Sequence, residues 1–490
     1  MIPPHHCWSS NKCCGAYSTI NYLFGSIPAF ENKNMFRLFA KTLDLARTAV
    51  HYVMYLILGL MMSVPGPTLL DLKQICGTDS FGISFIFTAR STGYLIGSVM
   101  GGIILDCLKN EDIAFMVSSL FVALGAFTIP WCRNLTILLV TFLITGFAMG
   151  FSNTGSNGSL LRIWGKKGAP YLQGLHFTYG VGGFLAPLLA APFLSAEVPT
   201  IPRDLTLLGV TQNLTDEILL SLSNITVEIV SETTIPSVTY AYIIIGCMAM
   251  LVCGCFVLVF SLASDEKRDT EKCQKEQIID PGLAFTIIVV ILACLQTGLI
   301  SGVEVSFAQM LTSYVVHSDH GLTKVEGSYI TSLYWGAFTI TRGLSIFLAC
   351  KVSVRRILTF DIILATLSTI ILLTIGSWSV TGLWVGTGLL GVGVASIFPA
   401  TLSWVEKYIN INNRIASVFT LVSNILEMTV PLAISIYLGT EPNVLFYFMT
   451  SATISVCALF ICLNVIMKRK GKKYRGRETE EKKQEKEIQV

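Results

Sequence analysis

Residues 239–262 read TYAYIIIGCMAMLVCGCFVLVFSL, and residues 265–277 soon afterwards read DEKRDTEKCQKEQ, the one long charged stretch inside a strongly hydrophobic region. A helix needs about 20 predominantly apolar residues to cross the hydrocarbon core of a membrane, and the first stretch has that length. The chain is 52% hydrophobic and only 13% charged, whereas a soluble chain carries roughly 25% charged residues. Lipid is therefore the expected solvent for much of the chain.

Similar apolar runs recur on both sides of the charged stretch, six before it and six after it. In lipid a helix satisfies every backbone polar group within itself, so the sequence predicts an all-α integral membrane protein with twelve transmembrane helices in two six-helix bundles. The expected spans are residues 48–70, 81–105, 113–131, 135–158, 169–194, 239–262, 281–312, 327–349, 355–375, 379–404, 413–438 and 443–467.

The predicted organisation follows from these runs. It comprises a cytoplasmic N-terminal segment (1–47), a first bundle (48–263), a linker (264–280), a second bundle (281–467) and a charged cytoplasmic tail (468–490), which we expect to be disordered. Cytoplasmic loops are enriched in Lys and Arg. With the N-terminus inside, the outside loops carry only Lys73, Arg133, Arg203 and Lys324. We therefore expect a multi-pass plasma-membrane protein with both termini in the cytoplasm.

The longest outside loop, residues 195–239, contains sequons at Asn213 and Asn224, where we expect N-glycosylation. Most of the fourteen cysteines lie inside apolar runs, where a thiol behaves as a small hydrophobic group. Cys76 and Cys132 fall in loops on the outside, where a disulfide between them is possible.

Two six-helix halves with cytoplasmic termini are typical of the major facilitator architecture. At the inner end of the second span, the residues from Gly102 to Asp106 resemble the G-x-x-x-D core of that superfamily's cytoplasmic loop motif. On the same span Gly93, Gly97 and Gly101 recur every four residues, which predicts close packing against another helix.

A more specific resemblance lies in LRIWGKKGAPYLQGLHF (161–177), SGVEVSFAQ (301–309) and EGSYITSLYWGAFTITRGLSIFLA (326–349), the last followed by ASIFPATL (395–402). Together these stretches resemble the sodium-dependent glucose transporter 1 branch of the major facilitator superfamily, and the likeness runs over about residues 47–467. It implies a sodium-coupled monosaccharide symporter that works by alternating access, with glucose as the expected substrate. An orphan sister lineage shares similar stretches, and for a member of that lineage the substrate stays open.

Ionisable side chains inside the predicted spans are candidates for function, because a charge at the bilayer centre costs about 2.5–3.5 kcal/mol on insertion scales. The four deepest are Arg90, His176, Glu304 and Glu427. His51, Arg342 and Asp361 lie nearer the cytoplasmic ends, which favours snorkelling to the interface or a structural pair such as Arg342 with Asp361.

A sugar site needs several hydrogen-bond partners and an aromatic or apolar platform. The resemblance implies that the first, fourth, seventh and tenth helices line the cavity, and we rank the seventh first. The expected substrate-binding residues are Asn153, Asn157, Gln173, His176, Gln296, Tyr334, Trp335 and Asn424. For each amide taken singly, a buried structural hydrogen bond is an equally good interpretation.

The expected cation-coupling site is the face of the seventh helix that carries Thr297, Ser301 and Glu304 at positions i, i+4 and i+7. A buried carboxylate supplies the negative charge that a sodium ion needs, and hydroxyls and backbone carbonyls of broken helices complete such sites. No other metal site is predicted. The same carboxylate can carry a proton instead, so the coupling ion stays open.

Arg90 and Glu427 are a predicted gating pair. At ~1.5 Å per residue each lies about 14–17 Å in from the outer end of its helix, and the second and eleventh helices face each other in the resembling fold. A salt bridge between the halves would offset much of the desolvation of the two charges. The alternative is that each side chain points into a separate water-filled cavity.

Sodium–sugar symport has two alternatives. One is a proton-coupled or facilitative carrier of another small polar solute, such as a nucleoside or a deoxy sugar. The other, a membrane-embedded enzyme, is disfavoured because the sequence shows no nucleophile–base or metal-ligating constellation. The expected partners are therefore the monosaccharide, the sodium ion and the lipid bilayer. No cofactor besides the ion, no nucleic acid and no second subunit are expected.

Overall fold

The computed structural model describes residues 29–108, 111–165, 168–195, 235–262, 283–409 and 413–488, and every regular element in these ranges is a helix. The predicted linker and the sequons at Asn213 and Asn224 lie outside the described residues. Within them, each predicted span corresponds to one helix or to two consecutive helices.

The helices fall into two groups that pack mainly within themselves. The N-terminal group comprises α2 (Ala29–Ser63), α3 (Pro65–Cys76), α4 (Ser80–Cys107), α5 (Glu111–Thr128), α6 (Leu135–Trp164), α7 (Gly168–Ala190) and α9 (Val238–Leu262). The C-terminal group comprises α10 (Leu283–His317), α11 (Lys324–Lys351), α12 (Val354–Ile371), α13 (Val380–Val394), α14 (Ile397–Val405), α15 (Asn413–Tyr437) and α16 (Val444–Ile488).

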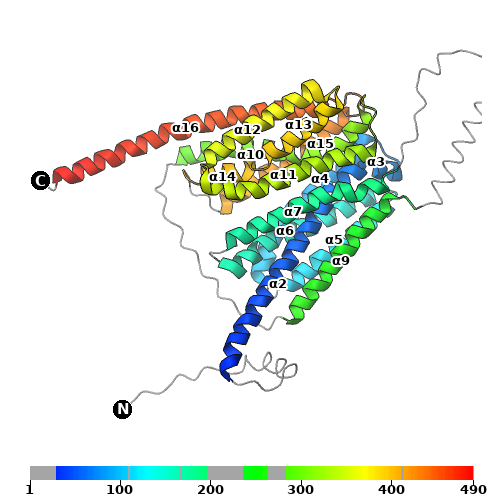
Figure 1. Cartoon of the computed structure of the whole chain (residues 1–490), viewed down its shortest axis with the longest axis horizontal. Coiled ribbons are helices and arrows are strands. Elements are labelled where there is room, and N and C mark those ends of the chain that lie inside the picture. Colours follow the sequence, from blue (N-terminus) through cyan, green and yellow to red (C-terminus); the bar gives the residue numbers. More distant parts are fainter. Residues whose placement is uncertain are drawn as a thin grey trace, which may run out of the picture.

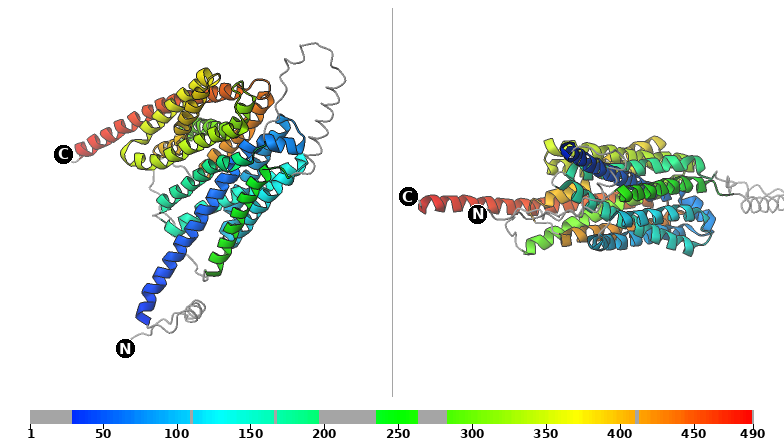
Figure 2. Two further views of the ribbon diagram at one scale, coloured as in Figure 1. Left: turned by 45° about the vertical axis from the view of Figure 1, so that its right-hand side comes forward. Right: turned by 90° about the horizontal axis from the view of Figure 1, so that it is seen from below.

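The two groups meet along two main interfaces, one between α7 and α11 and the other between α4 and α15. Figure 1 shows the groups close together at the end where α3 lies and spread apart at the opposite end, where α2 begins and α16 leaves the bundle. The left view of Figure 2 shows the same divergence. We refer to these two ends as the α3 end and the α16 end.

Ten of the described helices are long and apolar enough to cross a membrane. The second and eighth predicted spans are formed by α4 and α11, which are not among the ten and are 28 residues long each. Both contain many Gly, Ser and Thr residues, because each presents one face to the other group rather than to lipid. The predicted all-α membrane architecture is confirmed.

Two predicted spans are interrupted in the structure. The first ends at Ser63, and α3 then starts at Pro65, whose missing N–H and fixed φ suit the first position of a helix. The tenth is divided at Ala395 and Ser396 into α13 and α14. Pro399 has no N–H with which to bond the Ala395 carbonyl four residues earlier, so the helix cannot continue regularly across this point.

The helical segments also extend beyond the predicted limits at both ends of the chain. α2 begins at Ala29, well before the expected start at residue 48. α16 runs to Ile488 and projects from the bundle in Figure 1, whereas the tail from residue 468 was expected to be disordered. Its Lys, Arg, Glu and Gln residues have high helix propensity, and opposite charges four residues apart support a helix further.

The predicted glycine packing is present between α4 and α6. A Cβ at Gly97 would overlap the carbonyl oxygen of Phe147, and one at Gly150 would overlap that of Tyr94. The two backbones therefore touch, as small residues permit in membranes. This contact fixes the position of α4, which carries Arg90.

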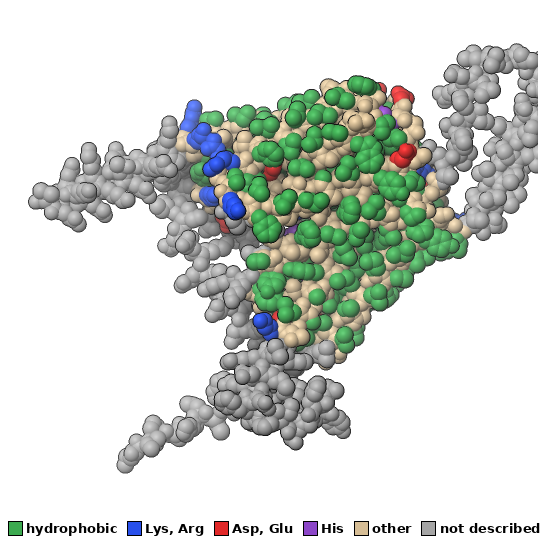
Figure 3. Space-filling view, in the orientation of Figure 1, with side chains coloured by type: hydrophobic (Ala, Val, Ile, Leu, Met, Phe, Trp, Pro, Cys, Tyr) green, Lys and Arg blue, Asp and Glu red, His purple; other side chains and the backbone are tan. Residues whose placement is uncertain are grey.

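The surface agrees with a membrane-spanning body. In Figure 3 hydrophobic side chains cover the face between the two ends, and Lys and Arg side chains gather at the α16 end. This is the end expected in the cytoplasm from the Lys and Arg distribution in the loops.

Candidate functional site

Four charged side chains from both groups gather at the centre of the molecule. Glu427 on α15 interacts electrostatically with Glu304 on α10 and with Arg90 on α4. Arg342 on α11 forms an ion pair with Glu304, with 3.8 Å between Nη2 and Oε2. Two guanidinium groups therefore balance two carboxylates. We call these four residues the charged tetrad.

The Arg90 side chain is only 2% exposed. Its Nη1 donates a hydrogen bond of 3.1 Å to the carbonyl of Met62, in the last turn of α2. Carbonyls at the end of a helix lack partners within it, so a neighbouring guanidinium can satisfy them. The Cζ atom also lies 5.5 Å from the centroid of the Phe87 ring. Arg90 thus connects α4 to the α2–α3 break.

Arg342 makes a similar set of contacts in the C-terminal group. Its Nε donates a hydrogen bond of 3.1 Å to the carbonyl of Ala395, at the α13–α14 break. Its Cζ lies 4.2 Å from the centroid of the Phe338 ring. The predicted structural pair with Asp361 is wrong, because Arg342 faces α10 and α13 instead. Within the described residues the buried Oδ2 of Asp361 has no hydrogen-bond partner.

The N-terminal group contributes a polar cluster around Tyr55 on α2. Its hydroxyl donates to Asn153, with 2.7 Å to Oδ1, and accepts from Asn157 Nδ2 at 2.6 Å. The His176 ring lies edge-on to Tyr55 at 5.8 Å between centroids, and His176 also interacts electrostatically with Arg342 across the two groups. Three residues predicted from sequence are therefore brought together. Tyr55 was missed, although it lies in the first span, which was expected to line the cavity.

Aromatic side chains line the C-terminal side of the centre. The hydroxyl of Tyr334 donates to the backbone carbonyl of Glu304 at 3.1 Å. Trp335 is buried beneath Gly183 of α7, and its Nε1 has no partner in the described residues. Tyr179 was also missed by sequence reasoning. It interacts electrostatically with all four members of the charged tetrad, which places it beside them.

Other predicted residues have structural bonding partners here. Gln296 Nε2 donates to Thr401 Oγ1 on α14 at 2.9 Å. The Thr297 hydroxyl and the Asn424 amide each donate to a carbonyl of their own helix. Ser301 is 6% exposed one turn before Glu304, and Gln173 lies exposed on α7.

The predicted gating pair does not form an ion pair within 4.0 Å in this conformation, in the described part of the chain. Arg90 and Glu427 nevertheless come from facing helices and interact electrostatically. Their direct pairing therefore stays a prediction.

We expect Arg90→Ala and Glu427→Ala each to lower uptake by about tenfold or more, because each leaves the other charge in a poorly solvated site. The charge swap, Arg90→Glu with Glu427→Arg, should recover part of the loss. Initial uptake rates, normalised to surface expression, measure this. A swap no better than the single variants would reject the pairing.

At the α3 end a buried ion pair joins the two groups. Lys324 at the start of α11 lies 2.7 Å from Asp71 of α3, and their side chains are 4% and 5% exposed. Ser195 donates to Asp71 through its hydroxyl at 2.5 Å and through its backbone N–H at 3.1 Å. We call this the Asp71–Lys324 bridge. Sequence reasoning missed it, although Asp71 directly follows the first apolar run.

Serine side chains extend this closure along both interfaces. Ser328 and Ser332, one and two turns after Lys324 on α11, donate to backbone carbonyls of α7 at 2.7 Å each. Across the other interface, Ser84 of α4 lies 2.7 Å from Ser435 of α15. A pocket at this end, lined by residues of α3, α4, α10 and α15, has a volume of about 10 Å³, at the lower limit for one water molecule. The α3 end is therefore closed.

Two further predicted features lie near the ends of the helices. Gly102 lies in α4 near Thr154 of α6, and the Asp106 side chain lies outside the described residues. Cys76 donates through its thiol to the carbonyl of Cys132 at 3.1 Å, and both thiols are free. The two cysteines considered as a disulfide are thus neighbours in reduced form. Burial raises the pKa of the Cys76 thiol to about 11.

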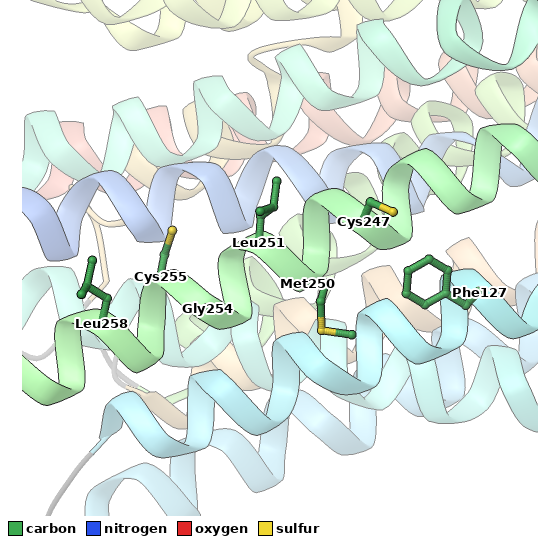
Figure 4. Close-up of a pocket in the computed structure, with 7 residues that line it drawn as sticks. All are labelled: Phe127, Cys247, Met250, Leu251, Gly254, Cys255 and Leu258. Carbon is green, nitrogen blue, oxygen red and sulfur yellow. The ribbon is translucent and has the colours of Figure 1, made fainter.

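A separate groove of about 620 Å³ opens between α5 and α9, away from the charged tetrad. Figure 4 shows its lining: Phe127, Cys247, Met250, Leu251, Gly254, Cys255 and Leu258. This lining offers neither a charge nor an amide to a polar solute. The groove is therefore unsuited to binding a polar solute.

Comparisons with known proteins agree with the fold. A family model described as Major Facilitator Superfamily matches residues 52–431. Sodium-dependent glucose transporter 1 of Xenopus laevis is 31% identical over 413 residues, covering 81% of this chain and 78% of the relative. The human protein of the same name is 30% identical, with 83% and 76% covered. Major facilitator superfamily domain-containing protein 4A of Mus musculus is 26% identical, with 85% and 91% covered.

Solved structures show the same architecture. The nucleoside transporter NupG matches with a TM-score of 0.58 and 12% identity, covering 87% of this chain and 99% of that one. The transporter FucP in its outward conformation matches with a TM-score of 0.57 and 16% identity, covering 86% and 98%. At these identities the likeness concerns the fold alone.

Proposed function

We propose that this chain, which belongs to the Major Facilitator Superfamily, couples the uptake of glucose or a related monosaccharide to sodium by alternating access. Membership of that superfamily makes it a multi-pass secondary transporter of a small solute and not an enzyme. Sodium and glucose are suggested by the names of its relatives, which are about 30% identical.

The charged tetrad is the observation that carries the proposal. Ionisable groups inside the membrane are costly and mark ion or substrate pathways. Here two carboxylates lie between the two groups, and Glu304 keeps 15% of its side chain exposed. A balanced set of charges suits a neutral solute, and a carboxylate within it can bind one small cation in competition with an arginine. Glu304 is the best candidate ligand for that cation, with the nearby Ser301 hydroxyl.

The sugar site is proposed to lie beside the tetrad. Asn153, Asn157 and His176 face it from the N-terminal group, with Tyr55 and Tyr179 as aromatic surfaces. Amide and hydroxyl groups that converge beside aromatic rings are what a polyhydroxylated ring requires.

With the termini in the cytoplasm, as proposed, the structure corresponds to an inward-facing state. The Asp71–Lys324 bridge and the serine contacts then close the outside. Glycosylation at Asn213 and Asn224 and a plasma-membrane location belong to the same proposal.

Uptake of labelled glucose into proteoliposomes tests this function. We expect uptake to require an inward sodium gradient and to fall to background when choline replaces sodium. Unchanged uptake in choline would remove sodium from the proposal. In that case an imposed pH gradient would test the alternative of a proton-coupled carrier, since Glu304 and Glu427 can also bind protons.

A further inference from the structure

The Glu304 carboxylate has an incomplete set of partners. Its Oε2 lies 3.8 Å from Arg342 Nη2, which is beyond hydrogen-bonding distance. The nearby Tyr334 hydroxyl bonds the backbone carbonyl of Glu304, not its carboxylate. Within the described residues, Arg342 is the one cationic side chain within 4.0 Å of this carboxylate. Arg342 therefore neutralises Glu304 while leaving its oxygens open to another ligand.

Arg342 does not depend on Glu304 for its position. Its Nε is bonded to the Ala395 carbonyl, which has no donor within its own helix because Pro399 lacks an N–H. The Phe338 ring supports the guanidinium at 4.2 Å. These two contacts hold a positive charge beside the carboxylate in the empty carrier.

We propose that Arg342 is the resident counter-ion of Glu304 and competes with the coupling cation for this carboxylate. The inference rests on the proposed function, in which a cation binds at Glu304. In the empty carrier Arg342 balances the charge of the carboxylate. The carrier can therefore switch between its inward-open and outward-open states without leaving an unpaired negative charge in the site. A bound cation places two positive charges beside one carboxylate and repels Arg342 towards Ala395.

The α13–α14 break then senses whether the cation is bound. α14 packs against α10, which carries Glu304, and against α12. A shift of the Arg342 side chain would change its hydrogen bond to the Ala395 carbonyl. That carbonyl lies at the α13–α14 break, where the tenth span is already interrupted. Glu427, another member of the charged tetrad, interacts electrostatically with Glu304 and with Arg90. Arg342 is in this role a positioning residue, because it acts on the cation through Glu304.

The test measures sodium binding without a sugar. Purified full-length protein is heated in increasing NaCl, with choline chloride holding the ionic strength constant, and the sodium concentration for half of the melting shift is recorded. Arg342→Gln removes the competing charge, so we expect this concentration to fall about tenfold, within the range typical of coupled sites. Arg342→Lys, whose shorter ammonium competes less well, should lower it about threefold.

The controls separate the two hypotheses. Arg356→Gln, an exposed arginine on α12, should leave the sodium response unchanged. If sodium shifts neither melting nor uptake of the wild type, the proposed function fails. If the wild type responds to sodium but the folded Arg342 variants respond at the same or higher concentrations, Arg342 does not compete and this inference is overturned. If the Arg342→Gln variant does not fold, the sodium response of Arg342→Lys, which keeps the positive charge, tests whether Arg342 competes with the cation.

Discussion

Glu304→Gln is expected to abolish sodium-driven uptake while the protein still folds and reaches the membrane. The amide keeps the size of the side chain but removes the charge that we assign to cation binding. The position is partly exposed and its carboxylate accepts no hydrogen bond within the described residues, so the substitution leaves no buried donor unpaired. It does leave Arg342 without its counter-ion, but Ala395 and Phe338 still hold that guanidinium.

The measurement compares uptake in sodium and in choline with surface expression held equal. We expect sodium-driven uptake to fall by roughly 100-fold, the effect of losing about 2.7 kcal/mol of binding free energy. Glu406→Gln is the matched control, because Glu406 is an exposed carboxylate on the same group at the end of α14. Wild-type kinetics in the Glu304 variant would return this residue to a purely structural role.

Asp71→Asn is expected to open the α3 end and to impair transport. Removing one partner of a buried ion pair costs about 3–5 kcal/mol, because the other charge stays desolvated and unpaired. Lys324 would be that charge, at 4% exposure. A penalty of this size shifts a conformational equilibrium by roughly two to four orders of magnitude. The conformation with the α3 end closed should then no longer be more stable than the conformation with this end open.

A cysteine at Ser328 reports this change, because Ser328 is fully buried in the α7–α11 interface. On a Ser328→Cys background, a membrane-impermeant maleimide should label the protein from outside only after Asp71→Asn. The exchange Asp71→Lys with Lys324→Asp should restore protection in part. Lys73→Met, which changes a half-buried lysine of the same helix, is the control. Equal labelling with and without Asp71→Asn would show that the bridge does not hold this end closed.

The transmembrane helices of this protein can be predicted from local sequence alone. A run such as residues 239–262 becomes a helix in lipid, because a single segment can pair its own backbone groups there only as a helix. The hydropathy of such a run therefore predicts the helix without knowledge of any neighbour. The superfamily was identified from the same sequence, through stretches such as residues 326–349 and 395–402.

The helix breaks were within reach of the sequence but were not predicted. Pro65 and Pro399 each remove one N–H, yet both lie inside apolar runs that hydropathy reads as continuous. Proline can also be accommodated within a membrane helix, as Pro187 is in α7 and Pro431 in α15. Proline leaves the carbonyl four residues earlier without its helical hydrogen bond. Whether the helix is interrupted or continues depends on which neighbouring group bonds to that carbonyl. At Ala395 that neighbour is Arg342.

The sequence by itself determined which charges lie in the membrane, since the position of Glu304 or Arg90 within an apolar run is read directly. Only the tertiary structure decided their partners. Arg342 pairs with Glu304 and not with Asp361, and Asp71 meets Lys324 although 253 positions separate them in the chain. Local hydropathy sets the depth of a residue, but rotation of each helix about its axis sets the direction of its side chain. That rotation is fixed by packing between helices such as α4 and α6, which involves residues distant in sequence.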